Sequence, residues 1–297
     1  MRLTKTVALA AGALLTLSLA ACGGGADSPG GSGHIDVEVA ADPQFPAGST
    51  MAKLNKAGKI TIGVKIDQPG VGFLKPGADM PEGFDIEMAR VVAAELGIDD
   101  SDINFKETIS DNREVYIKNG DVDIVIASYS ITDGRQQLVG QAGPYYVTGQ
   151  QLLVRDEDKD KISGPKDLKG NKVCSVEGST SLATAEDEYG ADPVPQGTYS
   201  ECVDALQNET VDAVTTDGAI LMGYAAEAPD ELEVVGDPFT EERYSVGYTK
   251  GDTQFCKFLV DTIKKSEESG QWADAFESTL GKSGVNTPEP PQMDTCK

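Results

Sequence analysis

The stretch from Ile124 to Arg135 constrains the fold more than any other part of the sequence, because a buried strand there leads directly into a polar turn. Residues 122–126 are apolar or β-branched apart from Asp123, a pattern that indicates a buried strand. Hydroxyls and then a guanidinium follow at Ser128, Ser130, Thr132 and Arg135. Open α/β sheets bind ligands at the carboxyl ends of their strands, and hydroxyls, backbone amides and the planar fork of an Arg suit a carboxylate. The stretch therefore predicts an α/β fold with a carboxylate-binding group, although a polar turn followed by a surface Arg fits the same residues.

Strand and helix patterns alternate on both sides of this stretch. Before it, they cover residues 59–65, 86–96, 104–106 and 112–119. Together with the strand at Ile124 they give a β-α-β-α-β order, which favours a parallel sheet with right-handed crossovers. After it, a second series begins with a strand at 172–176, and an Asp-led apolar strand at 212–214 again ends in polar residues. We therefore expect two similar α/β lobes.

The second series offers two more polar groups. The turn Gly178-Ser179-Thr180 opens a helix, and the free N–H groups at a helix start bind anions. It lacks the Lys of a phosphate-binding P-loop, so we do not expect a nucleotide, and Ser179 or Thr180 could equally serve only as the N-cap. Asp217 follows a strand, where it could hold an ammonium group or simply face solvent.

The motif Ser130-Ile131-Thr132-Asp133-x-Arg135, followed by Gly143-Pro144-Tyr145-Tyr146, resembles the polar amino-acid family of solute-binding proteins, which serve ABC importers. The order of strand, loop, Gly83-Phe84-Asp85 and helix resembles the N-terminal part of the same family. The resemblance covers essentially the whole mature domain. It implies a two-lobe, periplasmic-binding-protein-like (type II) α/β fold with a ligand cleft between the lobes. Lobe 1 would comprise residues 49–148 and 244–297, and lobe 2 residues 149–243.

The resemblance also implies roles for individual residues. The Gly-Ser-Thr turn would touch the α-carboxylate of an amino acid, Arg135 would hold the same group, and Asp217 would hold its α-ammonium. The full set of residues that we expect at the ligand comprises Lys65, Asp67, Arg113, Ser128, Ser130, Arg135, Ser179, Thr180 and Asp217.

The expected side-chain pocket differs from that of relatives that bind glutamine or basic amino acids between aromatic rings. Here the loop 67–73 has only Phe73, and the helix after Thr108 begins with Ser110-Asp111-Asn112-Arg113. A guanidinium at Arg113 could neutralise a distal carboxylate, and the pattern looks most like that of actinobacterial-type glutamate-binding lipoproteins. We therefore expect glutamate, with aspartate and glutamine as alternatives.

The mechanism that this resemblance implies is non-catalytic. A monomer without cofactor would capture an amino acid and deliver it to an ABC permease, which is driven by an ATPase in trans. Two other classes remain open. A dehydratase-like enzyme on the same fold would need a general acid or base in the cleft, and the only histidine, His34, lies far from the cleft motifs in the sequence. A ligand-sensing lipoprotein without a transporter is the other alternative.

Residues 1–21 have the features of an export signal: a basic start at Arg2 and Lys5 and an apolar stretch too short to span a membrane. The boundary Leu19-Ala20-Ala21-Cys22 resembles a lipobox, in which Cys22 becomes the lipid-modified N-terminus; an ordinary signal peptide with an incidental Cys is the alternative. Residues 22–48 are rich in Gly, Ser and Pro and predict a flexible tether. We therefore expect an exported protein, anchored by lipid to the outer face of the cell membrane.

The charge and the cysteines bound the remaining possibilities. The formal net charge is −24, and two units more negative without Arg2 and Lys5, which disfavours nucleic acid or an anionic membrane surface as a partner. The even number of cysteines left after Cys22 argues for two disulfides in an exported chain. Three pairings are possible, and we favour Cys174–Cys202 with Cys256–Cys296 because each pair then falls within one expected lobe. The spacing of these cysteines does not suggest a metal site.

Overall fold

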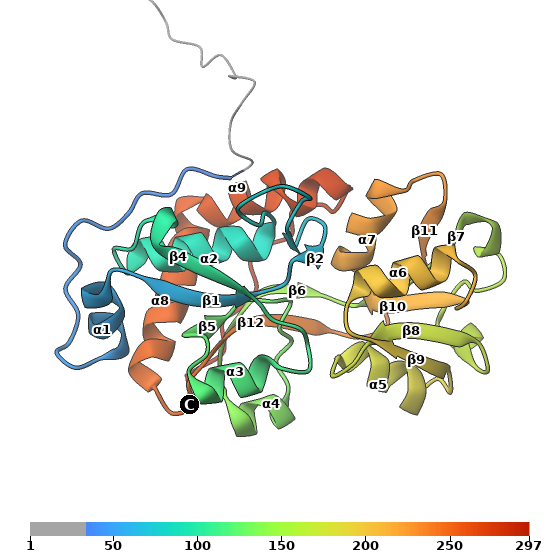
Figure 1. The fold of residues 1–297 in the computed structure, drawn as a ribbon, viewed down its shortest axis with the longest axis horizontal. Helices are drawn as coiled ribbons and strands as arrows, with labels where there is room; N and C mark the ends of the chain where they lie inside the picture. Colours follow the sequence, from blue (N-terminus) through green and yellow to red (C-terminus); the bar gives the residue numbers. More distant parts are fainter. Residues whose placement is uncertain (1–33, 297) are drawn as a thin grey trace, which may run out of the picture. The chain divides into compact units, whose positions relative to one another are not determined.

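The structure, a computed structural model, describes residues 34–296 of the 297-residue chain (Figure 1). The helices are α1 (Thr50–Ala57), α2 (Phe84–Glu95), α3 (Arg113–Asn119), α4 (Asp133–Leu138), α5 (Thr180–Asp187), α6 (Tyr199–Gln207), α7 (Gly218–Glu227), α8 (Thr253–Ser269) and α9 (Gln271–Ser278). The strands are β1 (Ile60–Val64), β2 (Asp67–Gln68), β3 (Gly72–Phe73), β4 (Ile103–Glu107), β5 (Ile124–Val125), β6 (Gly140–Thr148), β7 (Gln150–Arg155), β8 (Lys172–Val176), β9 (Asp192–Gln196), β10 (Ala213–Asp217), β11 (Leu232–Val235) and β12 (Glu242–Tyr248). Among the described residues no helix is long and apolar enough to cross a bilayer.

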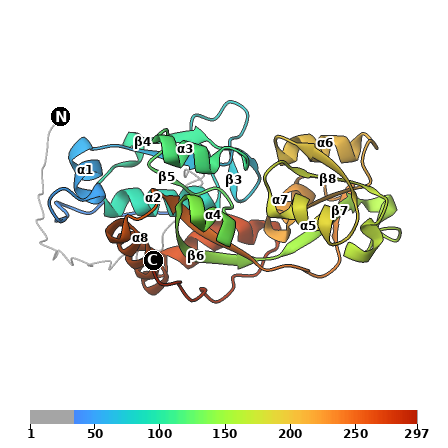
Figure 2. The same ribbon diagram turned by 90° about the horizontal axis from the view of Figure 1, so that it is seen from below.

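Two five-stranded sheets have the same internal order, with helices packed on each of them (Figures 1 and 2). The first sheet is ordered β4-β1-β5-β12-β6, and the second, read from its β9 end, β9-β8-β10-β7-β11. In both sheets the first three strands are parallel to one another, and the fourth strand is antiparallel to both of its neighbours. The prediction that the strands at 124 and 212 are equivalent is therefore confirmed, as is the α/β fold. We call the parts built on these sheets lobe 1 and lobe 2, and keep the boundaries at 148/149 and 243/244 as a proposal.

Each sheet is buried on both faces, which explains why residues 124–127 and 213–214 of the central strands are continuously apolar rather than alternating. In lobe 1, Ile124 and Ile126 face one hydrophobic core, while Val125 and Ala127 face a second core with Tyr129. In lobe 2, alternate residues of β7 and β10 likewise divide between two cores. Strands buried in this way have no freedom to slip in register, so the residues at their ends are placed reproducibly.

An Asp performs the same structural task before each central strand. The Asp123 carboxylate accepts the Thr61 N–H at 2.8 Å, and the Asp123 N–H donates to the Thr61 carbonyl at 2.8 Å. Asp212 makes the same pair of bonds with Lys172, again at 2.8 Å each. These reciprocal bonds fix the register between each central strand and its parallel neighbour.

The segment before α1 lies against lobe 1 and corrects the expectation of a flexible tether. Nδ1 of His34 is 2.5 Å from Oε1 of Glu87, whose side chain is fully buried, and the Ile35 N–H also donates to Glu87. The ring of Phe45 packs edge-on against Phe258. These contacts place residues 34–48 against lobe 1, in contrast to the flexible tether expected there. Residues 22–33, the expected signal peptide and Cys22 lie outside the described part of the chain.

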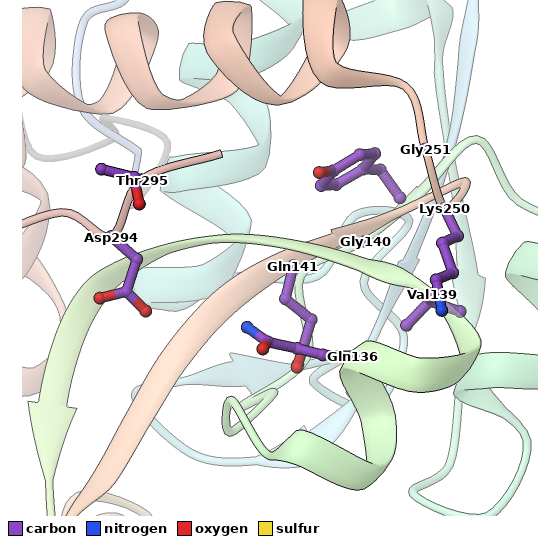
Figure 3. A pocket seen from close by; sticks show the side chains of 9 residues that line it. Gln136, Val139, Gly140, Gln141, Lys250, Gly251, Asp294 and Thr295 are labelled. Carbon is purple, nitrogen blue, oxygen red and sulfur yellow. The ribbon is translucent and has the colours of Figure 1, made fainter. Parts of the chain in front are cut away.

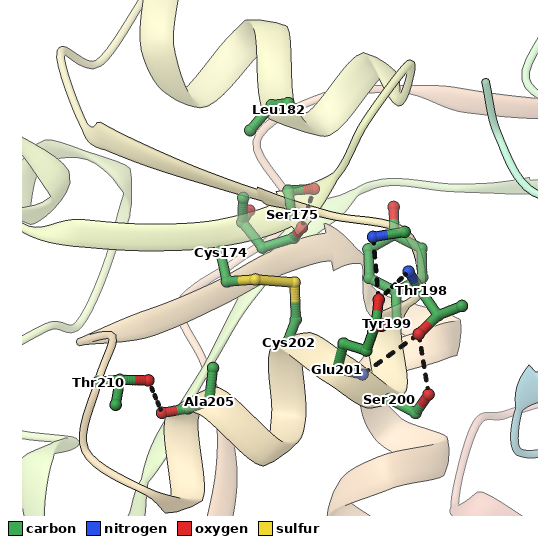
Figure 4. The surroundings of a disulfide bond; sticks show 12 residues. Cys174, Ser175, Leu182, Thr198, Tyr199, Ser200, Glu201, Cys202, Ala205 and Thr210 are labelled. Atoms are coloured by element: carbon green, nitrogen blue, oxygen red, sulfur yellow. Dashed lines mark hydrogen bonds between the residues drawn. A yellow bond between two sulfur atoms is a disulfide. The ribbon is translucent and has the colours of Figure 1, made fainter.

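Both disulfides have the pairing that the sequence favours. Cys174 of β8 is bonded to Cys202 of α6 within lobe 2 (Figure 4). Cys256 of α8 is bonded to Cys296 and holds the C-terminal segment on lobe 1.

Candidate functional site

A polar pocket lies where the ends of the two sheets meet, and most of the predicted ligand residues line it. Seven of the nine do so: Arg113, Ser128, Ser130, Arg135, Ser179, Thr180 and Asp217. The pocket measures about 10 Å³, room for about one water molecule. An amino acid can therefore occupy it only if the walls move apart.

Arg113 is the first residue of α3, and its buried side chain lies at the end of β5. Its Nη1 donates to the Ala127 carbonyl at 3.0 Å, and its guanidinium lies over the ring of Tyr129, 4.5 Å from the ring centroid. Its Nε is buried and has no hydrogen-bond partner within the described residues. Burial, helped by the nearby Arg135 charge, lowers the pKa of Arg113 to about 10. Arg113 therefore retains a buried donor and a positive charge with no directly paired carboxylate.

Arg135, in α4, connects the two lobes. Its Nη1 donates to the Ser130 carbonyl at 2.8 Å, and its Nη2 to the Gly178 carbonyl of lobe 2 at 3.0 Å. Its Nε is 3.5 Å from a carboxylate oxygen of Glu114. These contacts hold the guanidinium at the pocket, although they also occupy part of the fork that a ligand carboxylate would use.

Ser128 has a strained backbone that Asp85 supports. Its φ of 44° lies in the left-handed region, which is costly for a residue with a side chain. Its N–H donates to Asp85 at 2.6 Å, and Tyr145 donates to the other oxygen of the same carboxylate at 2.6 Å. Burial raises the pKa of Asp85 to about 6. Asp85 therefore shapes the pocket from behind and does not line it.

The hydroxyl turn of lobe 2 begins α5 while it also faces the pocket. Ser179 is the N-cap of α5, with its Oγ accepting the Leu182 N–H at 3.0 Å. Thr180 donates to Glu242 at 3.1 Å. The N-cap role and the lining role thus coexist in one turn.

Asp217 is the last residue of β10 and the main negative charge in the pocket lining. Its Oδ2 accepts the Tyr244 hydroxyl at 2.6 Å. Burial, and then repulsion from Glu242, raises the pKa of Asp217 to about 7. A ligand ammonium would replace lost solvation and favour the charged carboxylate.

Two predicted ligand residues do not line the pocket. Lys65 is buried behind it, and its Nζ donates to the hydroxyl of Ser110, which does line it, at 3.1 Å. Burial and the Arg113 charge lower the pKa of Lys65 to about 7. Asp67 instead accepts the backbone N–H of Tyr199 across the lobes at 2.8 Å.

The structure adds lining residues that sequence reasoning did not assign as ligand contacts: Ser110, Ser181, Tyr199, Thr216 and Ile220. Ser181 and Thr216 lie directly beside the predicted positions Thr180 and Asp217, so their neighbours could have signalled them. Tyr199 had no such signal, because only the packing of α6 on β8 brings its ring to the pocket.

A larger cavity, of about 510 Å³, lies elsewhere in lobe 1 (Figure 3). It is lined by residues of the segment from α4 to β6, by Tyr248 at the end of β12, by Lys250 and Gly251 after that strand, and by Asp294 and Thr295. Its few charged groups do not converge on one point, since Lys250 donates to the Gln137 carbonyl and Asp294 pairs with Arg243. Size alone therefore does not make it the better candidate.

The two α/β lobes have the same sheet order, and a charged pocket lies where the ends of their sheets meet. This arrangement is that of a two-lobe solute-binding protein. Residues 60–282 match the family described as bacterial extracellular solute-binding proteins, family 3. The glutamate-binding protein GluB of Corynebacterium efficiens is 37% identical over 286 residues, which cover 93% of this chain and 90% of that protein. The ABC transporter glutamine-binding protein GlnH of Bacillus subtilis is 33% identical, over 88% of this chain and 92% of that protein.

A solved structure agrees with these relatives. An ancestral amino-acid-binding protein, a precursor of cyclohexadienyl dehydratase, superimposes with a TM-score of 0.71 at 27% identity, over 78% of this chain and 100% of that one. The chain belongs to the family of bacterial extracellular solute-binding proteins, family 3, and is a polar amino-acid solute-binding protein. The names of its curated relatives describe binding proteins, not enzymes.

Proposed function

We propose that this protein captures glutamate outside the cell and delivers it to an ABC permease. The observation that carries the choice of glutamate is the buried Nε of Arg113, a donor that lacks a partner within the described residues. An unpaired buried donor on a charged group is costly, and a ligand carboxylate would satisfy it. The 37% identity to a glutamate-binding protein supports the same choice.

The charges of the pocket suit a dicarboxylic amino acid. Glutamate carries two carboxylates and one ammonium, and Arg135, Arg113 and Asp217 would pair with them one for one. In this arrangement Arg135 and the Ser179–Thr180 turn hold the α-carboxylate, and Asp217 holds the α-ammonium. Arg113 holds the distal carboxylate, with Lys65 behind Ser110 adding positive potential on the same side. Glutamine would leave the Arg113 charge unneutralised.

Calorimetry of the protein against all the common amino acids tests the choice of ligand. We expect glutamate to bind more tightly than glutamine or aspartate. Glutamine lacks the second charge, and aspartate, which is one methylene shorter than glutamate, would extend its distal carboxylate less far toward Arg113. Equal affinity for neutral and acidic amino acids would contradict the choice of glutamate while leaving the amino-acid-binding role in place.

Membrane anchoring through Cys22 is the second part of the proposal, and the lipobox-like boundary at residues 19–22 supports it. Cys22→Ala should release the protein into the medium or block its maturation. Mass spectrometry of the mature wild-type protein provides the direct test. An N-terminus downstream of Cys22, or an unmodified Cys22, would contradict the anchor.

Delivery to a permease can be tested through uptake. Deletion of this protein should abolish high-affinity uptake of radiolabelled glutamate by whole cells, and re-expression should restore it. Unchanged uptake would favour a ligand-sensing role. Incubation with arogenate or prephenate should yield no product if the protein is not a dehydratase-like enzyme.

A further inference from the structure

Asp67 lies outside the pocket lining but makes a bond between the lobes. It begins the β2–β3 hairpin, which belongs to lobe 1 because Gly70 and Val71 accept backbone N–H groups from the start of α2, each at 2.9 Å. The Asp67 carboxylate accepts the N–H of Tyr199, the first residue of α6 in lobe 2, at 2.8 Å. The Asp67 carbonyl accepts the hydroxyl of Tyr224 in α7. We call these two bonds the interlobe contact.

At the start of α6, one backbone N–H, that of Tyr199, donates to a residue of the other lobe. Thr198 and Glu201 form a capping box, in which each side chain accepts the other's backbone N–H (Figure 4). That reciprocal pair does not use the N–H of Tyr199, which Asp67 accepts instead. A carboxylate at a helix N-terminus also interacts favourably with the helix dipole. Asp67 thus fixes the backbone of the residue whose ring lines the ligand pocket.

The hairpin also packs unusually closely on lobe 2. A Cβ at Gly223 of α7 would lie 2.1 Å from the Pro69 carbonyl oxygen, so only glycine permits this approach. The pocket on the other side of Tyr199 has room for about one water. An amino acid can therefore enter only if the walls of the pocket move apart, and where this separates the lobes, the interlobe contact breaks and must re-form.

We propose that Asp67 is a positioning residue that holds Tyr199 and lobe 2 against lobe 1, and so slows release of the bound amino acid. This rests on the proposed function for the identity of the ligand. Asp67 would act without touching the ligand, by stabilising the arrangement of the lobes in which they meet around the pocket. Its loss should therefore raise the dissociation rate.

Glu107→Gln is a matched control for Asp67→Ala. Glu107 belongs to lobe 1, lines the same surface groove of about 550 Å³ as Asp67, and makes no side-chain bond to lobe 2 within the described residues. Both carboxylates also favour the charged form of Lys65. Any general effect of removing a negative charge near the pocket should therefore appear in both variants, whereas loss of the interlobe contact should appear only at Asp67.

The experiment measures release of radiolabelled glutamate into excess unlabelled glutamate. We expect Asp67→Ala to release it about tenfold faster than the wild type and than Glu107→Gln, which corresponds to ~1.4 kcal/mol. Asp67→Asn, which keeps an acceptor oxygen but loses the charge, should be intermediate. Tyr224→Phe removes the other bond from the lobe 2 side and should also speed release. If Asp67→Ala and Tyr224→Phe release glutamate as slowly as Glu107→Gln does, the proposal is overturned.

A distance measurement separates this proposal from the identity of the ligand. Spin labels can be introduced at the exposed positions Val115 in lobe 1 and Glu186 in lobe 2, since the four cysteines of the folded part are in disulfides. In the ligand-free protein, Asp67→Ala should shift the distribution to longer distances, and Glu107→Gln should not. If the wild type binds no glutamate, the choice of ligand fails while this measurement still decides the role of Asp67. If Asp67→Ala has the melting temperature of the wild type and its distance distribution is unshifted, the proposed role of Asp67 is overturned. If Asp67→Ala is destabilised, the distance distribution of Tyr224→Phe decides the question in the same way.

Discussion

The two lobes share a sheet order but carry opposite charges at the ends of their central strands. In lobe 1, β5 leads into Ser128, Ser130 and then Arg135, with Arg113 beside them. In lobe 2, β10 ends at Asp217, and the turn before α5 supplies hydroxyls and helix N–H groups. Both central strands are preceded by an Asp that makes the same reciprocal bonds to a neighbouring strand. The scaffold is thus common to both lobes, and the chemistry is not.

This difference explains why neither lobe makes a complete site. Lobe 1 offers buried cations: burial, and then repulsion from a neighbouring Arg, lowers the pKa values of Arg113 and Lys65. Lobe 2 offers a buried carboxylate whose pKa is raised by burial and by Glu242. In the proposed arrangement, an amino acid placed between the lobes would satisfy the charges of both walls. A ligand that bridges two such lobes stabilises the arrangement in which they meet.

The largest effect should come from Arg135, to which we assign the α-carboxylate that all amino acids share. Arg135→Ala should abolish measurable binding of glutamate, glutamine and aspartate alike, because it removes the partner of the shared α-carboxylate. Leaving that carboxylate buried and unpaired costs ~3–5 kcal/mol. Calorimetry checks this, with Arg243→Ala as control, since Arg243 pairs with Asp294 outside the pocket lining. Retained binding in Arg135→Ala would contradict the assignment of the α-carboxylate to lobe 1.

The disulfides offer a test of how far each lobe depends on its own cross-link. Replacing Cys174 and Cys202 together by Ala, or Cys256 and Cys296 together, should each lower the free energy of unfolding by ~2–4 kcal/mol. The two closed loops, with sequence separations of 28 and 40, are too similar for a large difference.

Ligand affinity should distinguish the two cross-links. The Cys174–Cys202 bond joins β8 to α6, whose first residue, Tyr199, lines the pocket, so its loss should also weaken glutamate binding. The Cys256–Cys296 bond lies away from the pocket, and its loss should leave binding unchanged. Urea unfolding and calorimetry on both double variants check this, and equal losses of affinity would contradict it.

A smaller effect concerns pH and the buried acid of lobe 2. The pKa of Asp217 is raised from its ordinary 3.8 to about 7, so the folded protein binds a proton that the unfolded chain has already released. The stability contributed by the protonated group is present below pH 4 and is lost as the pH rises toward 7. The ligand-free protein should lose at most ~1.4 kcal/mol per pH unit from this group in that window.

Asp217→Asn isolates this contribution. The variant should lack this part of the pH dependence, while the contribution of Asp85, whose pKa is also raised, is common to both proteins and cancels. Urea unfolding at several values between pH 4.5 and 7 provides the comparison. Parallel stability curves for wild type and variant would show that Asp217 is not the titrating group.

Much of this arrangement follows from local sequence patterns. The apolar strands ending in hydroxyls, in Arg135 and in Asp217 predict both the fold and the charges of the two walls, because strand ends of a buried sheet are placed by the sheet itself. What the sequence does not reveal depends on contacts between distant segments. Tyr199 reaches the pocket only through the packing of α6.

Two further features also depend on distant partners. Ser128 takes its left-handed backbone because Asp85 accepts its N–H. Residues 34–48 resemble a tether in composition, yet the segment lies on lobe 1, where His34 and the Ile35 N–H contact the buried Glu87. Neither partner can be recognised from the local sequence.

The central claim is that Arg113 selects a second carboxylate, and a comparison of two ligands on one variant tests it most directly. Calorimetry should show that Arg113→Ala weakens glutamate binding by ~2–4 kcal/mol, the usual cost of leaving a buried charge without its partner. Glutamine, whose amide is neutral, should be affected much less, and Arg243→Ala should change neither affinity. If Arg113→Ala weakens glutamate and glutamine equally, or weakens neither, Arg113 does not determine the choice of ligand and the assignment of glutamate loses its physical basis.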